Sequence, residues 1–217
     1  MSAIERVNEA RRSPWRWLGY GGAAALILML TAVLTGTVAP ASLALSNETV
    51  WYAIRASGVI AYLFLAASTL WGLLLTTRAV KALLPAAVAL DLHNYLSWIA
   101  IGLTALHAVL LLFSDFFAYR VVDLLIPFIG PFEPFWVGLG VIGLYLMVAT
   151  SLSFSFIKQL GHKSFRQVHY LTYAAFLLAL LHSIVAGTDT AAMTGVYLVS
   201  GLAVALLTLY RLIAVRS

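Results

Sequence analysis

The sequence predicts an all-α integral membrane protein, a six-helix transmembrane bundle, and three observations lead to that prediction. Of the 217 residues, 63% are hydrophobic and 10% are charged, whereas a soluble domain is about half apolar and about a quarter charged. Six apolar runs each approach or exceed the roughly 20 residues that a helix needs to cross a bilayer. The Lys and Arg residues lie near the ends of those runs, which is typical of membrane orientation and not of a nucleic-acid-binding stripe. We therefore expect contact with membrane lipid and no nucleic acid.

The apolar runs are expected to be helices, because unpaired backbone polar groups cannot face lipid. They occupy residues 17–38, 52–76, 91–113, 135–156, 168–187 and 193–213. The first run follows a basic start, as in a signal peptide. It is longer than the apolar core of such a peptide and more spans follow, so we expect it to be retained. The chain then consists of an N-terminal segment, 1–16, and one six-helix domain, 17–217.

The distribution of positive charge predicts the orientation. With the N-terminus in the cytoplasm, all 13 Lys and Arg residues fall inside except Arg55 and Arg120. This split agrees with the excess of positive charge that cytoplasmic loops carry. We expect a multi-pass protein of the cell membrane with a cytoplasmic N-terminal segment and a cytoplasmic C-terminus.

Cysteine is absent, which limits the cofactors. Disulfides, iron–sulfur clusters and thiolate-bound zinc are excluded, and covalent haem attachment lacks its Cys-x-x-Cys-His run. Any metal centre must depend on His, Met or carboxylate ligands.

Four of the five histidines lie within two apolar runs. His93 and His107 are 14 positions apart on the third run, and His169 and His182 are 13 apart on the fifth. The remaining one, His162, lies in a basic inner segment that we expect to be a solvated loop. Ionisable residues inside a membrane are costly and mark function. Hydrogen bonding between helices is the alternative role, but two pairs at nearly equal spacing favour a binding site.

The spacing places the histidines in two layers. Steps of 14 and 13 residues rise roughly 21 and 20 Å along a helix. Both runs cross from inside to outside, so His93 and His169 share an inner depth, and His107 and His182 share an outer depth. Facing imidazoles at one depth can ligate a haem iron from both sides, which predicts two stacked haem sites between the third and fifth helices. On a straight fifth helix, however, a 13-residue step leaves the two side chains about 140° apart, so this helix must bend or be irregular.

The paired spacing, His-x13-His with His-x12-His, resembles that of the ferric reductase-like transmembrane domain superfamily, which includes NADPH oxidases and ferric reductases. Three segments are similar to it: DLHNYLS at 91–97, VHYLTY at 168–173 and WYAIRASG at 51–58. The resemblance covers nearly the whole chain.

That resemblance implies two noncovalent haem b groups and electron flow from inside to outside. The inner iron would be ligated by His93 and His169, and the outer iron by His107 and His182. Larger members of the superfamily continue into flavin- and nicotinamide-binding domains. The Gly-x-Gly-x-x-Gly run at 138–143 lies inside an apolar run of membrane-spanning length, and not between a strand and a helix as a dinucleotide fingerprint does. Flavin is therefore expected only on a separate partner.

Three further residues are candidate cofactor contacts. Arg55 is the base within the apolar runs that lies away from the cytoplasmic side; it would pair with an outer haem propionate or extend to the outer headgroups. Phe176 lies midway between His169 and His182, where it would fill the gap between the haems or only pack. Arg166 would pair with an inner propionate or only contribute to orientation.

Two redox functions follow, and one other class competes with them. The first is transmembrane electron transfer from a cytoplasmic flavoprotein reductase or a membrane quinol to ferric iron, oxygen or a similar outer acceptor, as in a ferric reductase-like oxidoreductase. The second is a haem-binding membrane anchor that feeds a separate periplasmic or extracellular reductase, which would be an outer-side acceptor protein. A transporter or scaffold is the third reading, but the intramembrane carboxylates that proton-coupled transport often uses are missing.

Overall fold

The structure is a computed structural model that describes residues 46–76 and 84–214, and within these ranges it contains helices and no strand. The elements are α3 (Asn47–Leu75), α5 (Ala86–Leu110), η2 (Leu111–Phe113), α6 (Val121–Leu125), α7 (Pro134–Ser155), α8 (Ile157–His169), α9 (Leu171–Val185) and α10 (Thr190–Ala214). The described ranges include five helical spans long and apolar enough to cross a membrane, which confirms the all-α prediction. The expected first span, 17–38, and the segment 1–16 lie outside the described residues, so a bundle of six remains a prediction.

The helices begin at recognisable local signals. Ser46 caps α3, because its hydroxyl accepts a hydrogen bond from the backbone N–H of Thr49 at 3.2 Å. Pro85 directly precedes α5, and Pro134 occupies the first position of α7, where its missing N–H costs nothing. The second run was expected to begin at residue 52, and α3 begins earlier, at Asn47. A helix continues through polar residues at the membrane surface that a hydropathy count leaves out.

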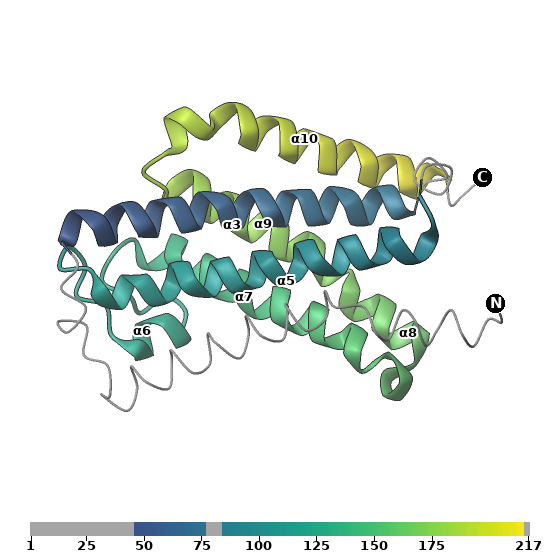
Figure 1. The fold of residues 1–217 in the computed structure, drawn as a ribbon, viewed down its shortest axis with the longest axis horizontal. Coiled ribbons are helices and arrows are strands. Elements are labelled where there is room, and N and C mark those ends of the chain that lie inside the picture. Colours follow the sequence, from purple (N-terminus) through teal and green to yellow (C-terminus); the bar gives the residue numbers. More distant parts are fainter. Residues whose placement is uncertain (1–45, 77–83, 215–217) are drawn as a thin grey trace.

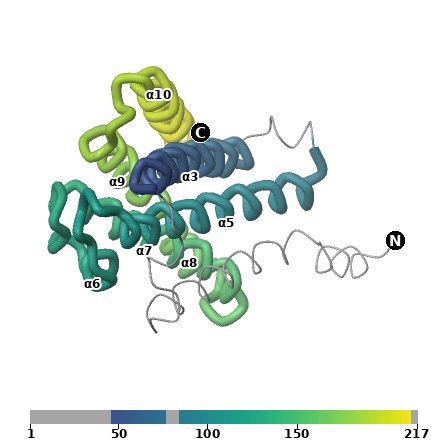
Figure 2. Tube along the Cα trace, turned by 60° about the vertical axis from the view of Figure 1, so that its left-hand side comes forward, coloured from purple at the N-terminus to yellow at the C-terminus, as the bar shows by residue number. Residues whose placement is uncertain are grey.

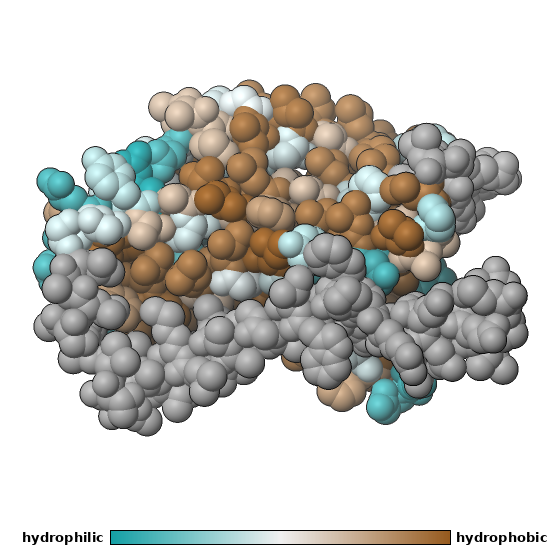
Figure 3. Space-filling model, in the orientation of Figure 1, coloured by the Kyte–Doolittle hydropathy of each residue, from teal (hydrophilic) through white to brown (hydrophobic). Residues whose placement is uncertain are grey.

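Two antiparallel helix pairs form the body of the protein. Helix α3 packs along α5, and α7 packs along α9, while α10 lies against both α3 and α9 (Figures 1 and 2). The chain direction alternates, so α5 and α9 run parallel. On the face that Figure 3 shows, hydrophobic side chains cover the middle of α3 and α10, and hydrophilic ones gather at the end where α3 begins. This distribution is that of a bundle with lipid around its middle.

The fifth span differs from its predicted form. The basic segment around His162 was expected to be a loop, and it is instead helix α8, in which His162 is exposed. The backbone of Gly161 within α8 has a φ of 76°, in the region that glycine adopts without strain. Only Tyr170 separates the end of α8 from the start of α9. The span thus contains a break directly after His169.

A folded connection between α5 and α7 closes one end of the bundle. The buried carboxylate of Asp123 on α6 accepts hydrogen bonds from the backbone N–H of Arg120 at 2.8 Å and from its Nε at 3.1 Å. The guanidinium of Arg120 lowers the pKa of Asp123 below its usual value. Tyr119 donates its hydroxyl hydrogen to the carbonyl of Phe132 at 3.2 Å. These bonds hold the connection over the end where α3 begins.

Candidate cofactor site

Helices α5, α8 and α9 bring the four histidines together as two pairs. The ring centres of His93 and His169 lie 6.1 Å apart, with the ring planes at 76°. The ring centres of His107 and His182 lie 6.3 Å apart, with the planes at 72°. We call these the 93/169 site and the 107/182 site. Each pair combines one ring from α5 with one from the α8–α9 span, at two levels of the bundle.

An irregularity at Tyr170 lies between His169 and His182, which are 13 positions apart and contact α5 at two different levels of the bundle. His169 is the last residue of α8, and His182 lies on α9 after the break. The backbone of Tyr170 keeps helical angles (φ −65°, ψ −18°), but the N–H of Tyr173 donates to the carbonyl of Tyr170, three residues back, at 3.2 Å. The helix is therefore locally irregular between the two histidines. Both rings face α5, and the irregularity that the spacing requires is present.

Three of the four rings are oriented by the same kind of hydrogen bond. The Nδ1–H of His107 donates to the carbonyl of Ile54 at 2.8 Å, and that of His93 to the carbonyl of Ser68 at 3.1 Å. The Nδ1–H of His182 donates to the carbonyl of Trp136 at 3.0 Å. A carbonyl only accepts, so in each ring Nδ1 carries the hydrogen and Nε2 keeps its lone pair. This is the arrangement of an imidazole prepared to ligate a metal.

Each of these three rings also lies against a glycine, four residues after the carbonyl that accepts its hydrogen bond. The pairs are Gly58 with His107, Gly72 with His93, and Gly140 with His182. A Cβ on Gly58 would lie 2.9 Å from both Cε1 and Nδ1 of the His107 ring, which is closer than such atoms approach. Without a side chain, the glycine lets the ring rest on the neighbouring backbone, where the carbonyl is within reach.

The glycines are functional residues that our sequence reasoning missed, although the sequence contains a signal for them. Gly58 and Gly72 are 14 positions apart on α3, the same separation as His93 and His107 on α5. When two antiparallel helices pack side by side, two residues 14 positions apart on one helix can each lie opposite one of two residues 14 positions apart on the other. A glycine pair that repeats the histidine spacing on the adjacent span therefore predicts the packing.

His169 lacks this arrangement. Its Nδ1 is buried and has no hydrogen-bond partner among the described residues. Its ring instead stacks on Phe165, with the centres 5.3 Å apart and the planes at 26°. The four candidate ligands are thus three rings held by a carbonyl and a glycine, and one held by ring stacking.

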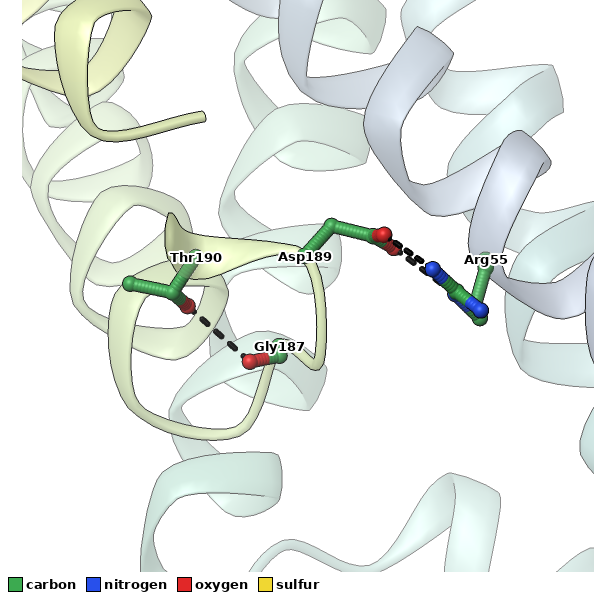
Figure 4. A network of polar contacts seen from close by, with 4 residues as sticks. All are labelled: Arg55, Gly187, Asp189 and Thr190. Atoms are coloured by element: carbon green, nitrogen blue, oxygen red, sulfur yellow. Dashed lines mark hydrogen bonds and ion pairs between the residues drawn. The ribbon is translucent and has the colours of Figure 1, made fainter. Parts of the chain in front are cut away.

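Arg55 borders the same cavity as His107 and His182, but it has a partner within the protein. Its Nε donates to Oδ2 of Asp189 at 2.9 Å, and its Nη2 donates to Oδ1 of the same carboxylate (Figure 4). Asp189 lies in the turn between α9 and α10, where Thr190 Oγ1 donates to the Gly187 carbonyl at 2.9 Å. The hydrogen bonds from Arg55 lower the pKa of Asp189. The sequence predicts a cofactor propionate or lipid headgroups as the partner of Arg55, and the structure shows Asp189 as its partner.

Two arginines border the cavity of the 93/169 site. Arg166 Nη2 donates to the Tyr170 hydroxyl, and Arg211 Nη1 donates to the Tyr173 hydroxyl, both at 3.4 Å. Arg211 also lies over the Tyr170 ring, 5.7 Å from its centre. Among the described residues neither arginine forms an ion pair with a carboxylate. Arg166 is a candidate from the sequence, whereas Arg211 is not, because Arg211 lies on the last span, far from any histidine in sequence.

Phe176 lies in the core of the bundle. It is 4% exposed, and its ring centre is 6.2 Å from that of Tyr62. The Tyr62 ring also meets Tyr197 edge-on at 4.9 Å. Leu65 and Met147 border both cavities. An apolar layer therefore separates the two histidine sites, and Phe176 belongs to the core cluster that includes both of these residues.

Within the part of the chain that the structure describes, no group of three or more His, Cys, Asp or Glu residues could hold a metal ion. A site with only two imidazoles can bind a metal whose remaining ligands belong to a cofactor. Comparisons with protein-family models, with curated proteins and with solved structures found no match for this chain. The resemblance to the ferric reductase-like superfamily stays a prediction.

Proposed function

We propose that this protein carries electrons across the membrane through two haem b groups, one at each histidine site. In the orientation that the charges predict, the 93/169 site is the inner one and the 107/182 site the outer one. The observation that supports the proposal most strongly is the pair of ring separations, 6.1 and 6.3 Å. Bound haem would supply reversible one-electron chemistry, and the histidines would hold its iron.

The ring separations fit two imidazoles on one metal. A nitrogen–metal distance of about 2 Å on each side, as imidazole makes with divalent metals, plus about 1 Å from nitrogen to ring centre, gives roughly 6 Å between centres. Histidines that hydrogen-bonded each other directly would lie closer. The carbonyl bonds at Nδ1 support the same interpretation, because they direct Nε2 as the ligand and raise its basicity.

Charged groups at the cavities fit the carboxylates of a haem. Arg166 and Arg211 border the 93/169 cavity without a carboxylate partner among the described residues, so both would pair with inner propionates. At the 107/182 site Arg55 would contact a propionate while it shares its charge with Asp189.

The electron donor is proposed to be a separate cytoplasmic flavoprotein reductase. Helix α8 exposes Lys158, Lys163 and Arg166 on the proposed inner side, and these charges would steer an acidic partner. A membrane quinol is the competing donor. The acceptor is ferric iron, oxygen or a separate outer reductase.

Haem content and spectrum test the proposal. We expect two noncovalent haems per chain, both low-spin and six-coordinate, in a pyridine haemochrome assay of the purified protein. His107→Ala and His182→Ala should each remove the same haem, while His93→Ala and His169→Ala remove the other. His162→Ala, at an exposed position on α8, is the control and should keep both. A protein that binds no haem, or one, would contradict the proposal.

Proteoliposomes test the donor and the acceptor. NADPH alone should not reduce the haems, whereas NADPH with a flavin reductase, or a quinol, should. Oxidation of the reduced protein by an external ferric chelate would favour direct reduction of iron. If neither the chelate nor oxygen accepts electrons, the anchor-subunit function is favoured.

A further inference from the structure

We infer that His169 is the exchangeable ligand, so that the 93/169 site, and not the 107/182 site, opens to a small external ligand such as carbon monoxide. This inference rests on the proposed function and adds a difference between its two sites. It starts from the one candidate ligand that is not fixed to a neighbouring backbone.

The first argument is the missing hydrogen bond. His93, His107 and His182 donate Nδ1–H to backbone carbonyls at 2.8 to 3.1 Å. Such a bond holds the ring at one angle and strengthens the imidazole as a ligand. His169 has a buried Nδ1 without a partner in the ranges 46–76 and 84–214 that the structure describes. Its bond to a metal would therefore be the weakest of the four.

The position of His169 in its helix also differs from that of His93. His93 lies inside α5, and His107 and His182 lie in the last turns of α5 and α9, whereas His169 is the last residue of α8 and is followed by the single turn residue Tyr170. A residue at a helix end is held by fewer intrahelical hydrogen bonds than one in the middle. The backbone at His169 therefore holds its ring less firmly than the interior of α5 holds the ring of His93, the other candidate ligand of the same site.

The residues around the His169 ring include both hydroxyl groups and an aromatic ring. The cavity of the 93/169 site is bordered by the hydroxyl-bearing residues Thr150, Ser151 and Thr172. The hydroxyls of Thr150 and Thr172 already donate to backbone carbonyls, but their oxygens can still accept a hydrogen bond from the Nδ1–H of a ring that leaves a metal. Stacking on Phe165 opposes the departure, because the ring must slide off this contact.

Carbon monoxide binding to the reduced protein tests the inference. We compare His107→Ala, which would keep only the inner haem, with His93→Ala, which would keep only the outer one. A single hydrogen bond corresponds to roughly a fivefold change in a rate or equilibrium constant. The inner-only protein should bind carbon monoxide at least about fivefold faster, and the wild type should bind about one molecule per two haems. Equal rates, or faster binding in the outer-only protein, would overturn the inference.

Two measurements identify the ligand that leaves. Phe165→Ala removes the ring that stacks on His169 and should accelerate carbon monoxide binding further. Phe154→Ala removes a ring that contacts Phe165 and not His169, so it should have a smaller effect. After photolysis, the iron–histidine stretch of the inner haem should be that of a hydrogen-bonded imidazole, as expected when His93 stays. A stretch typical of an imidazole without that bond would show that His93 leaves instead. Absence of haem would contradict the proposed function, whereas two haems with equal exchange rates would contradict this inference alone.

Discussion

The two histidine sites have nearly the same ring separation, but they differ in support and in charge. At the 107/182 site both rings rest on glycines and donate to carbonyls, and the nearby Arg55 is paired with Asp189. At the 93/169 site only His93 is held in this way, and Arg166 and Arg211 have no carboxylate partner among the described residues. The comparison shows that nearly the same separation of the two rings is reached whether both rings or only one is hydrogen-bonded to the backbone. At one site both rings are hydrogen-bonded and the arginine is paired; at the other, among the described residues, one ring has no such bond and two arginines have no carboxylate partner.

Removing the glycine contacts should have the largest effect. Gly58→Ala places a Cβ 2.9 Å from the His107 ring, and Gly72→Ala places one 2.9 Å from Cε1 of His93. The ring must move and lose its carbonyl bond, so each variant should lose one haem: the outer for Gly58→Ala and the inner for Gly72→Ala. Haem per chain and the spectrum of the remaining haem measure this.

Gly102→Ala is the matched control for the glycine variants. Gly102 lies on α5 between the two histidines, and a Cβ there would meet nothing within 4 Å. Alanine is favoured over glycine inside a helix by about 1 kcal/mol, so this variant should keep both haems and its stability. Retention of both haems by Gly58→Ala would show that the ring does not need the glycine.

Changing the ion pair should shift the potential of one haem only. Asp189→Asn leaves Arg55 unneutralised beside the 107/182 cavity, and positive charge favours the reduced form. The outer potential should rise on the order of tens of millivolts, where about 59 mV is a tenfold change in a one-electron equilibrium. Arg55→Gln should lower it, and Arg55→Gln with Asp189→Asn should return it near the wild-type value. A spectroelectrochemical titration resolves the two haems.

Asp115→Asn is the control for the ion-pair variants, because Asp115 is exposed at the same end of the bundle and does not border the cavity. If Asp189→Asn moved neither potential, or moved the inner one, the pair would have no link to the outer site.

Shortening Phe176 should have a smaller effect. Phe176 packs in the buried core cluster and borders neither cavity, so Phe176→Leu should keep both haem spectra and lower stability by about 1 kcal/mol. Thermal unfolding in detergent measures the loss, and Leu177→Ala, at a side chain that is 53% exposed, is the control. Loss of a haem in Phe176→Leu would contradict a packing role and favour a cofactor contact.

The pH dependence of the ion pair should be the smallest effect. The pKa of Asp189 is lowered by its hydrogen bonds from Arg55, so the pair is complete above the usual carboxyl range and is lost only as pH falls through the lowered pKa. The difference in outer potential between wild type and Asp189→Asn should therefore stay constant from about pH 5 to 8. A difference that shrinks within that range would mean that Asp189 is not paired with Arg55.

The sequence by itself determined the class of the protein and the depth of its histidines. Apolar runs of bilayer length can only be helices, since lipid offers no partners for the backbone. The rise per residue then fixes how far apart His93 and His107 lie along α5. These properties depend on distance along one chain segment, and hydropathy and spacing report that distance directly.

The tertiary structure decided which groups meet across segments. Asp189 reaches Arg55 from a turn 134 positions away, and Arg211 joins the 93/169 cavity from the last helix. The local irregularity at Tyr170, between His169 and His182, is not indicated by any glycine or proline at that position. The unpartnered Nδ1 of His169 was equally hidden, because a hydrogen bond depends on a separation of about 3 Å between atoms of different helices. Only the packed arrangement of the helices sets distances of that size.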